Sequence, residues 1–283
     1  MKRLIVLLGV AGVSLSAVFV RWSTAPSLVL VSYRMAFSTL LLVPMVWRQR
    51  EEFRRLERRE LLLSLLSGVF LGAHFTGYFE ALRWTSIASA VVLVDTSVLF
   101  VALASVLILR KKLSRRAWLA VALAFGGSVV VALADTAAGT GALRGDLFAL
   151  TGSVCMAVYT MLGAVCRRKL STTVYTFLVY LAAAGTVVPA ALAGGTALTG
   201  WGGVNLLAAL GMAVFCTLLG HSVFSWGLRY LPPAFISTAN LLEPVLASVW
   251  GLFLFGERPG PQVVLGGAVI LLGIGLYSRE AEA

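Results

Sequence analysis

Apolar residues gather in long segments along the chain, and short stretches rich in polar and charged residues separate them. An α-helix needs about 20 mostly apolar residues to cross the hydrocarbon core of a membrane. Ten segments come close to this length, namely residues 4–20, 26–47, 61–82, 85–109, 115–134, 146–166, 172–194, 204–228, 232–255 and 260–278. Several connections are very short, so neighbouring segments should form antiparallel hairpins. The pattern predicts an all-α integral membrane protein with ten transmembrane helices.

The composition supports the membrane class. Of the 283 residues, 59% are hydrophobic and 12% are charged, whereas about a quarter of the residues in a soluble domain are charged. The net charge of +11 could point to nucleic acid. However, the basic residues lie in short runs between apolar segments, and the sequence contains no recognised nucleic-acid-binding motif. We therefore expect the lipid bilayer as a partner, and no nucleic acid.

The distribution of basic residues predicts the orientation in the membrane. With a cytoplasmic N-terminus, the inner segments hold 18 Lys and Arg residues, the outer segments hold 4, and Arg34 lies inside a span. Cytoplasmic loops of membrane proteins carry such an excess. Both the N- and C-termini are therefore expected in the cytoplasm, which requires an even number of spans. The segment 48–60 also carries four glutamates, and we expect it to be a solvated cytoplasmic turn with helical character.

The second half of the chain repeats features of the first at a distance of 146 residues. At this distance Gly127 pairs with Gly273, within a run of weak matches. The halves are then residues 1–134, with helices 1 to 5, and residues 146–283, with helices 6 to 10, joined by an extracytoplasmic linker at 135–145. Because five is odd, the second half enters the membrane from the opposite side. Two inverted five-helix repeats are typical of secondary transporters, which handle substrate near the midplane where the repeats meet.

Short motifs along the chain indicate a family. The first span contains GVSLSAVFVRW, the second contains SYRMAF, and the third runs through ALRWTS into the fourth. The second half contains GLRYLPPA, followed by LLEPVLASVWGLFLFGE. In the order and spacing of these motifs the chain resembles the EamA-like branch of the drug/metabolite transporter superfamily. It departs from the family pattern at residues 108–116, ILRKKLSRR, which lack the Gly-Glu found at the matching place in the second half.

The resemblance implies a bacterial inner-membrane carrier. Such carriers move small metabolites, often amino acids or amines outward, by alternating access through a central cavity. The resemblance covers essentially the whole chain but does not name a substrate.

Ionisable residues deep in the spans are the first candidates for a functional site. Burying each costs at least about 2.5–3.5 kcal/mol on insertion scales, so each needs a partner or a function. The ionisable residues inside the predicted spans are Arg34, Glu80, Asp95 and Glu243, with His74 and His221 as neutral candidates.

The two carboxylates Asp95 and Glu243 lie near the middle of repeat-related helices, although they are not equivalent at the repeat distance. We expect both at the repeat interface, binding substrate or carrying protons, because burial favours the neutral carboxyl. Structural pairing is the alternative for each. Arg34 could orient a substrate carboxylate with its guanidinium fork, or pair with one of these acids. His74 and His221 are candidates for proton coupling, and satisfied buried histidines are equally expected.

Small and aromatic residues complete the predicted site. Ser64, Gly68, Gly72 and Thr76 recur at steps of four, which predicts a close helix contact with Glu80 at its end. Tyr78 and Trp226 are candidates for cavity lining and for cation–π contact with a substrate amine. These two residues join Glu243, Asp95, Arg34 and Asn240 as predicted substrate contacts.

The segment 237–259 carries Glu243 followed by Pro244 within an apolar run. Ser237, Asn240, Glu243 and Gly251 share one face of a helix, which is small and polar. Pro244 removes a backbone hydrogen bond near Asn240. Irregular backbone at membrane depth is tolerated where it lines a cavity or packs in protein. We therefore predict a kinked helix whose polar face points to the repeat interface.

These features favour a secondary transporter that exports an amino acid, amine or related metabolite. Uptake or exchange of a cationic or nucleobase-type metabolite is the alternative. A membrane-embedded enzyme would need clustered nucleophiles or metal ligands, and the sequence shows none. A structural membrane protein would show a dry interior with Glu243 fully salt-bridged. The sequence predicts no cofactor and no metal site, because the three cysteines form no CxxC pair. Proton coupling and a homodimer are left open.

Overall fold

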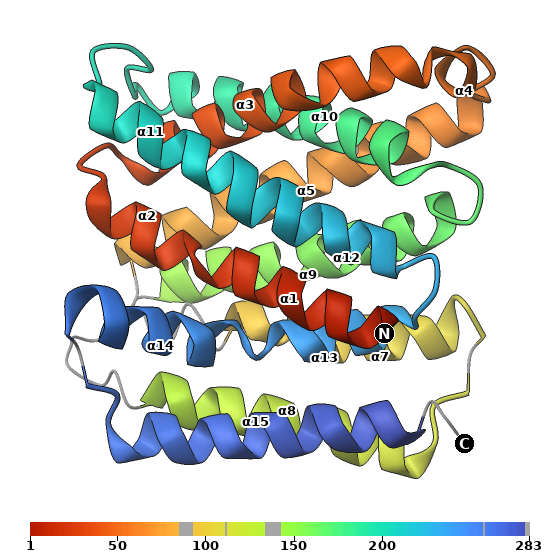
Figure 1. Ribbon diagram of the computed structural model, residues 1–283, viewed down its shortest axis with the longest axis vertical. Coiled ribbons are helices and arrows are strands. Elements are labelled where there is room, and N and C mark those ends of the chain that lie inside the picture. Colours follow the sequence, from red (N-terminus) through yellow and green to blue (C-terminus); the bar gives the residue numbers. More distant parts are fainter. Residues whose placement is uncertain (85–92, 111, 134–142, 257, 281–283) are drawn as a thin grey trace.

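The computed structural model describes residues 1–84, 93–110, 112–133, 143–256 and 258–280. Every regular element in these ranges is a helix (Figure 1). In chain order, the helices are α1 (Lys2–Ser14), α2 (Ser16–Trp22), α3 (Ser27–Arg48), α4 (Arg50–Arg54), α5 (Arg58–Trp84), α7 (Ser97–Leu107), α8 (Arg115–Leu133), α9 (Leu143–Cys166), α10 (Thr172–Ala193), α11 (Gly203–Gly211), η1 (Met212–His221), α12 (Ser222–Gly227), α13 (Pro233–Asn240), α14 (Glu243–Phe255) and α15 (Pro261–Glu280).

Seven helical stretches in the described ranges are long and apolar enough to cross a membrane. They are Lys2–Trp22, Ser27–Arg48, Arg58–Ala81, Leu143–Cys166, Thr172–Ala193, Gly203–Gly227 and Pro233–Phe255. Two shorter apolar helices follow the same pattern, at Leu93–Leu107 and Pro261–Tyr277. The prediction of an all-helical chain built to cross a membrane several times is confirmed for the described residues. The count of ten spans stays a prediction.

The helix ends agree closely with the predicted segments. The segment predicted at 172–194 is α10, and the one at 61–82 lies within α5. The segment at 85–109 is described only from residue 93 onward, and most of the predicted linker at 135–145 lies outside the described residues. The agreement follows from the apolar pattern, because an apolar helix end coincides with the change to a polar loop.

The helices lie side by side, with their axes running in roughly the same direction across the view (Figure 1). The start of α1, the short helix α4 and the end of α15 lie at one edge of the molecule, which we call the α4 edge. The end of α2 and the start of α11 lie at the opposite edge, which we call the α11 edge. Helices α8 and α15 lie at one end of the long axis, and α3 and α10 at the other.

Most of the extensive helix contacts join the first half of the chain to the second. Helix α8 packs along α15, α5 packs against α9 and α10, α3 packs against α10, and α1 packs against η1. The interior of the molecule is therefore the interface between the two halves of the chain.

Glycines allow the contact between α5 and α10 to be close. A Cβ added to Gly72 on α5 would lie 2.7 Å from Thr186 Cβ on α10. Gly68, one turn earlier, has Val179 O and Ala182 Cβ at the place that a side chain would occupy. Small residues let helix backbones approach in this way in membranes. The predicted close helix contact is confirmed, and its partner is α10.

Several helices are interrupted in mid-length. A turn at Leu15 separates α1 from α2, a turn at Thr96 precedes α7, and Leu241 and Leu242 separate α13 from α14. The segment Met212–His221 is π-helical. Broken backbone at membrane depth needs protein or a cavity around it, since lipid cannot satisfy its polar groups. The interruptions mark the part of the interface where polar side chains gather.

Candidate functional site

Arg34 on α3 lies at the centre of the interface and is 2% exposed. Its Nε donates to Thr217 Oγ1 at 2.7 Å, and its Nη1 reaches Ser16 Oγ at 3.5 Å. The guanidinium lies 4.7 Å from the centroid of the Phe75 ring. Nη2 is buried and has no hydrogen-bond partner in the described part of the chain. A buried donor without a partner costs free energy and is available to a ligand.

The π-helix η1 positions the partner of Arg34. Thr217 Oγ1 also donates to Met212 O, five residues earlier, at 3.3 Å. The Tyr180 hydroxyl donates to Thr217 O at 3.3 Å and lies 2.9 Å from Ser222 Oγ. π-Helical turns are rare and frequently occur at functional sites. Sequence reasoning missed Thr217, because a single threonine in an apolar run carries little signal.

Glu243 is the first residue of α14 and follows the break at Leu241 and Leu242. Asn240, the last residue of α13, donates from Nδ2 to Glu243 Oε2 at 3.4 Å. Asn240 Oδ1 is buried without a hydrogen-bond partner among the described residues. The prediction of a kinked helix is confirmed: Pro233–Phe255 is one helical stretch that a turn at Leu241 and Leu242 interrupts, and Pro244 lies in the first turn after it. Proline fits there because first-turn N–H groups have no helical acceptor.

Asp95 lies just before the turn at Thr96. Its Oδ2 is buried and has no hydrogen-bond partner in the ranges that the structure covers. Ser128 on α8 approaches the carboxylate without closing a hydrogen bond of normal geometry. Thr96 Oγ1 donates to Leu93 O and lies 2.8 Å from Ser153 Oγ on α9, so this turn is held against α9. Both predicted carboxylates therefore lie at breaks in their helices.

The charged groups act on one another without forming a closed ion pair. Glu243 lies within electrostatic range of both Arg34 and Asp95. Arg34 and Glu243 make no direct salt bridge within the described ranges, where the contacts of Arg34 are Thr217, Ser16 and Phe75. Tyr78 lies within range of both carboxylates. The centre therefore offers one free guanidinium donor and two acidic groups to a small polar ligand.

The two histidines flank this centre. His74 Nδ1 lies 3.0 Å from Gly152 O, and its ring stacks on Tyr78 at 6.5 Å. His221 is buried, and its Nδ1 has no partner in the described residues. The Phe75 ring lies edge-to-face against His221 at 5.7 Å. Phe75 thus lies between Arg34 and His221, a contact that sequence reasoning did not anticipate.

Two predicted residues lie apart from the centre. Trp226 is near the end of α12, and its ring lies 4.9 Å from that of Tyr230, which in turn lies under Lys2. This places Trp226 toward the α4 edge, so it is not part of the central group. Glu80 is half-buried on α5, near the end of the glycine face that packs on α10.

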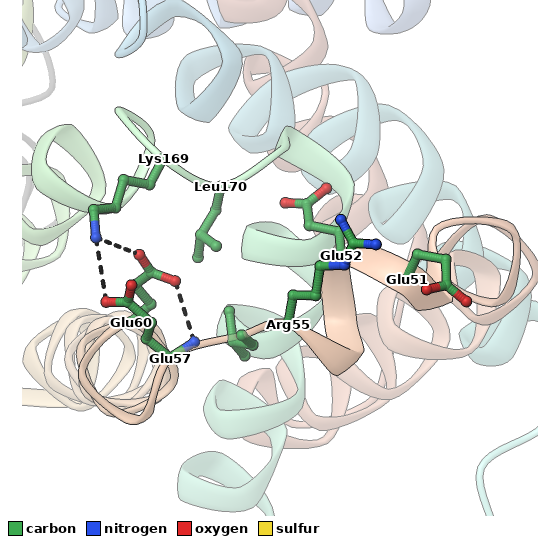
Figure 2. A pocket seen from close by; sticks show the side chains of 8 residues that line it. Glu51, Glu52, Arg55, Glu57, Glu60, Lys169 and Leu170 are labelled. Carbon is green, nitrogen blue, oxygen red and sulfur yellow. Dashed lines mark hydrogen bonds and ion pairs between the residues drawn. The ribbon is translucent and has the colours of Figure 1, made fainter.

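A small hollow adjoins the central group, and a larger one lies at the α4 edge. A cavity of about 10 Å³ lies between α9, α12 and α13, and Tyr159, Phe224 and Asn240 line it. A cleft of about 450 Å³ opens at the α4 edge, lined by Glu51, Glu52, Arg55, Leu56, Glu57, Glu60, Lys169 and Leu170 (Figure 2). The ion pairs with Glu60 and Glu57 raise the pKa of Lys169 above its usual value. In the described ranges, no group of three or more His, Cys, Asp or Glu residues is placed to hold a metal ion.

Comparison with known proteins gives consistent matches over the whole chain. The EamA-like transporter family matches residues 2–133 and 143–279. An uncharacterized transporter of Archaeoglobus fulgidus is 26% identical, covering 89% of this chain and 87% of its own length. The pseudopaline exporter CntI of Pseudomonas aeruginosa is 25% identical, covering 92% of this chain and 89% of its own length.

A solved structure described only as "Crystal structure of protein" shares the fold. Its TM-score is 0.84 at 16% identity, and the alignment covers 99% of this chain and 98% of that chain.

Proposed function

Because the chain belongs to the EamA-like transporter family, and is thus a multi-pass membrane transporter rather than an enzyme, we propose that it exports a small metabolite by alternating access. The proposed substrate is an amino acid, an amine or a related compound, and the proposed location is the bacterial inner membrane with both termini in the cytoplasm. The relative named as a pseudopaline exporter supports the outward direction.

One observation carries the substrate class. The buried centre presents a free donor, Arg34 Nη2, and free acceptors, Asp95 Oδ2 and Asn240 Oδ1. A ligand with both a carboxylate and an ammonium group would satisfy donor and acceptors together. Buried polar groups without partners are costly in the empty protein, so a ligand that pairs with them is favoured. Tyr78 lies near the acidic groups and can contact the ammonium end.

The excess of acidic groups supports a second candidate. Glu243 acts electrostatically on both Asp95 and Arg34. A cationic amine without a carboxylate would pair with the two acids, and Arg34 would keep its hydrogen bond to Thr217. Protons bound to the acids could take the place of the amine. Proton coupling through Glu243, Asp95 or the histidines His74 and His221 belongs to this proposal.

The helix contacts support two inverted repeats. Gly127 on α8 lies against Gly266 on α15, and Gly273 lies against Ala120. Gly273 and Gly266 are the residues 146 positions after Gly127 and Ala120. The two contacts are therefore the same contact with the halves exchanged, as a twofold axis in the membrane plane requires. We take residues 1–134 and 146–283 as the repeats, and ten spans as the count.

A ligand screen followed by flux measurement tests the proposal. Purified protein is mixed with amino acids, amines and nucleobases in turn, and the thermal shift of each mixture identifies ligands. Each hit is then loaded into proteoliposomes, and its efflux is followed with and without a pH gradient. If only amino acids bind, the result supports a substrate with both a carboxylate and an ammonium group. If only amines bind, it supports a cationic substrate without a carboxylate. Chemical conversion of a hit, without movement, would contradict the transporter.

A further inference from the structure

The two halves of the chain are tied together by polar contacts at the α4 edge. Lys169, in the turn between α9 and α10, binds Glu60 Oε1 at 2.9 Å and Glu57 Oε2 at 3.2 Å (Figure 2). Glu60 lies in the first turn of α5, and its side chain is 13% exposed, whereas Lys169 is 62% exposed. We call the contacts of Lys169 with Glu57 and Glu60 the α4-edge tie.

A second set of contacts joins the halves at the α11 edge. Asn205 Oδ1 accepts from Ser23 Oγ at 2.7 Å, from Thr24 N at 2.8 Å and from Ala25 N at 3.1 Å. Ser23, Thr24 and Ala25 form the turn between α2 and α3, and Asn205 lies in the first turn of α11. Asn205 is buried. We call these contacts the α11-edge tie.

The two ties occupy the same place in the two halves. Lys169 lies 145 residues after Thr24, and Asn205 lies 145 residues after Glu60. Glu60 and Asn205 are each the third residue of their helix. In both ties, the start of a long span in one half holds the hairpin turn of the other half. Exchanging the halves converts one tie into the other and moves it to the opposite edge (Figure 1).

Further contacts strengthen the correspondence at the α4 edge. Glu52 Oε1 accepts from the backbone N–H of Ser171 at 2.6 Å, and Gln49 Oε1 accepts from Ser171 Oγ at 2.9 Å. Ser171 lies 146 residues after Ala25, whose backbone N–H binds Asn205. This distance is one residue longer than the one that relates Thr24 to Lys169, and the acceptors Asn205 and Glu52 are not equivalent. Each hairpin turn nevertheless gives a backbone N–H to a side-chain acceptor in the other half.

From this pairing we infer that the two ties are latches, each of which must open for the carrier to open at its own edge. When two halves rock around a central site, contacts at one edge separate while those at the other close. Both ties are made in this structure, and Arg34 is buried in the interface between the two edges that they join. The rocking motion rests on the proposed function, while the ties themselves are contacts of the structure.

The latches differ in chemistry, although they correspond in position. The α4-edge tie is made by charged side chains, of which Lys169 and Glu57 are largely exposed and Glu60 is 13% exposed. Ion pairs with exposed members stabilise weakly. The α11-edge tie is neutral, centres on the buried side chain of Asn205 and is made largely with backbone N–H groups. Loss of one partner there leaves buried groups unpaired, which costs more. We infer that the α4-edge latch is the easier one to open.

Hydrogen–deuterium exchange of the full chain in lipid nanodiscs tests this inference without a known substrate. In Lys169→Gln, amides at the start of α5 and around the turn from α9 to α10 should exchange about two- to fivefold faster, as loss of an exposed pair predicts. Amides at the end of α2 and the start of α11 should keep the wild-type rate. The exchanged pair Lys169→Glu with Glu60→Lys should restore slow exchange.

The reverse pattern is expected for Asn205→Ala, with faster exchange confined to the α11 edge. Asn205→Asp keeps the acceptor oxygen and serves as the matched control. Arg54→Ala is the control at the other edge, because it removes an exposed ion pair with Glu51 inside α4. Should Asn205→Ala not fold, Ser23→Ala removes one donor at the same edge. Faster exchange at both edges, or an effect of Arg54→Ala equal to that of Lys169→Gln, would overturn the latches.

Failure of the latches is separable from failure of the proposed function. If wild-type protein moves no ligand in proteoliposomes but the exchange patterns follow the edges, the transport proposal is wrong and the latches stand. If transport is found and the variants exchange like wild type at both edges, the latches are wrong and the transporter stands.

Discussion

Asp95 and Glu243 are half-buried acidic groups in the interface between the two halves. Each lies at a helix break, and Asp95 Oδ2 has no partner among the described residues. We predict that Glu243→Gln and Asp95→Asn each reduce efflux about tenfold or more, because a hydrogen bond to a charged group contributes about 1.5–3 kcal/mol. Proteoliposome flux measures this at several pH values.

The matched control for these variants is Glu51→Gln, which removes an exposed carboxylate at the α4 edge. Its flux should equal that of wild type. Unchanged flux and unchanged pH dependence in both Glu243→Gln and Asp95→Asn would contradict a role for the carboxylates.

Thr217 holds Arg34 in place through its hydroxyl. Thr217→Val keeps the shape but leaves Arg34 Nε buried without an acceptor, which costs about 1–3 kcal/mol. We predict a lower thermal unfolding temperature and weaker binding of any carboxylate ligand. Thr217→Ser retains the hydroxyl and should bind like wild type. Equal ligand affinity in the two variants would show that Thr217 does not position Arg34.

The sequence identified the ionisable members of the site but not the residues that hold them. Arg34, Asp95 and Glu243 stand out because charge is rare in apolar segments. Thr217, Ser16 and the Phe75 ring were missed, because hydroxyls and aromatics are common in membrane helices. That Thr217 reaches Arg34 depends on the π-helical register of η1, and the sequence does not reveal that register.

At the scale of helices, close contact between α5 and α10 depends on glycine. A methyl group at Gly72 would lie 2.7 Å from Thr186 Cβ and 3.0 Å from Ala183 O. Overpacking of this kind costs about 1–3 kcal/mol, so Gly72→Ala should lower the unfolding temperature in detergent. Gly185→Ala on α10 is the control, since no atom lies within 4 Å of its added Cβ.

In the control, alanine should raise helix stability by about 0.5–1 kcal/mol, because glycine loses more backbone entropy on folding. A destabilised Gly185→Ala together with an unchanged Gly72→Ala would contradict the packing described here.

Helix positions were predictable from the sequence, whereas the exact residues at which helices break were not. The ends of α10 follow the change from apolar to polar residues, and the sequence pattern contains that change. The break consists of Leu241 and Leu242, and the apolar periodicity gives no sign of an interruption at two leucines. Pro244 indicated an irregularity nearby, but its fixed geometry is equally compatible with a kink and with a new first turn.

At the scale of the molecule, the inverted repeat makes a prediction about sidedness. With ten spans and cytoplasmic termini, Lys112 lies in the cytoplasm and Arg258 lies outside. In intact cells, a membrane-impermeant thiol reagent should label Arg258→Cys and not Lys112→Cys, because the native cysteines are buried. After cell lysis both should react. Labelling of both, or of Lys112→Cys alone, would rule out this topology.

The different chemistry of the two ties predicts that salt acts on one edge of the molecule only. Raising ionic strength from about 0.01 M to about 1 M shortens the screening length from about 30 Å to about 3 Å. This weakens the attraction of Lys169 for Glu57 and Glu60, which are at least partly exposed. The hydrogen bonds of Asn205 join neutral groups, so salt leaves them intact. Amide exchange at the α4 edge should therefore accelerate with salt while exchange at the α11 edge stays constant.

The variant Lys169→Gln separates this effect from general salt effects on the protein. Without the ammonium group the α4 edge has already lost its ion pairs, so its exchange should be fast at low salt and change little as salt is added. An α4 edge that remains salt-sensitive in Lys169→Gln would show that other charges hold it closed. An α11 edge that accelerates with salt would show that the two ties do not open independently. The first result would remove Lys169 from the latch, and the second would replace two latches by one cooperative opening of the whole interface.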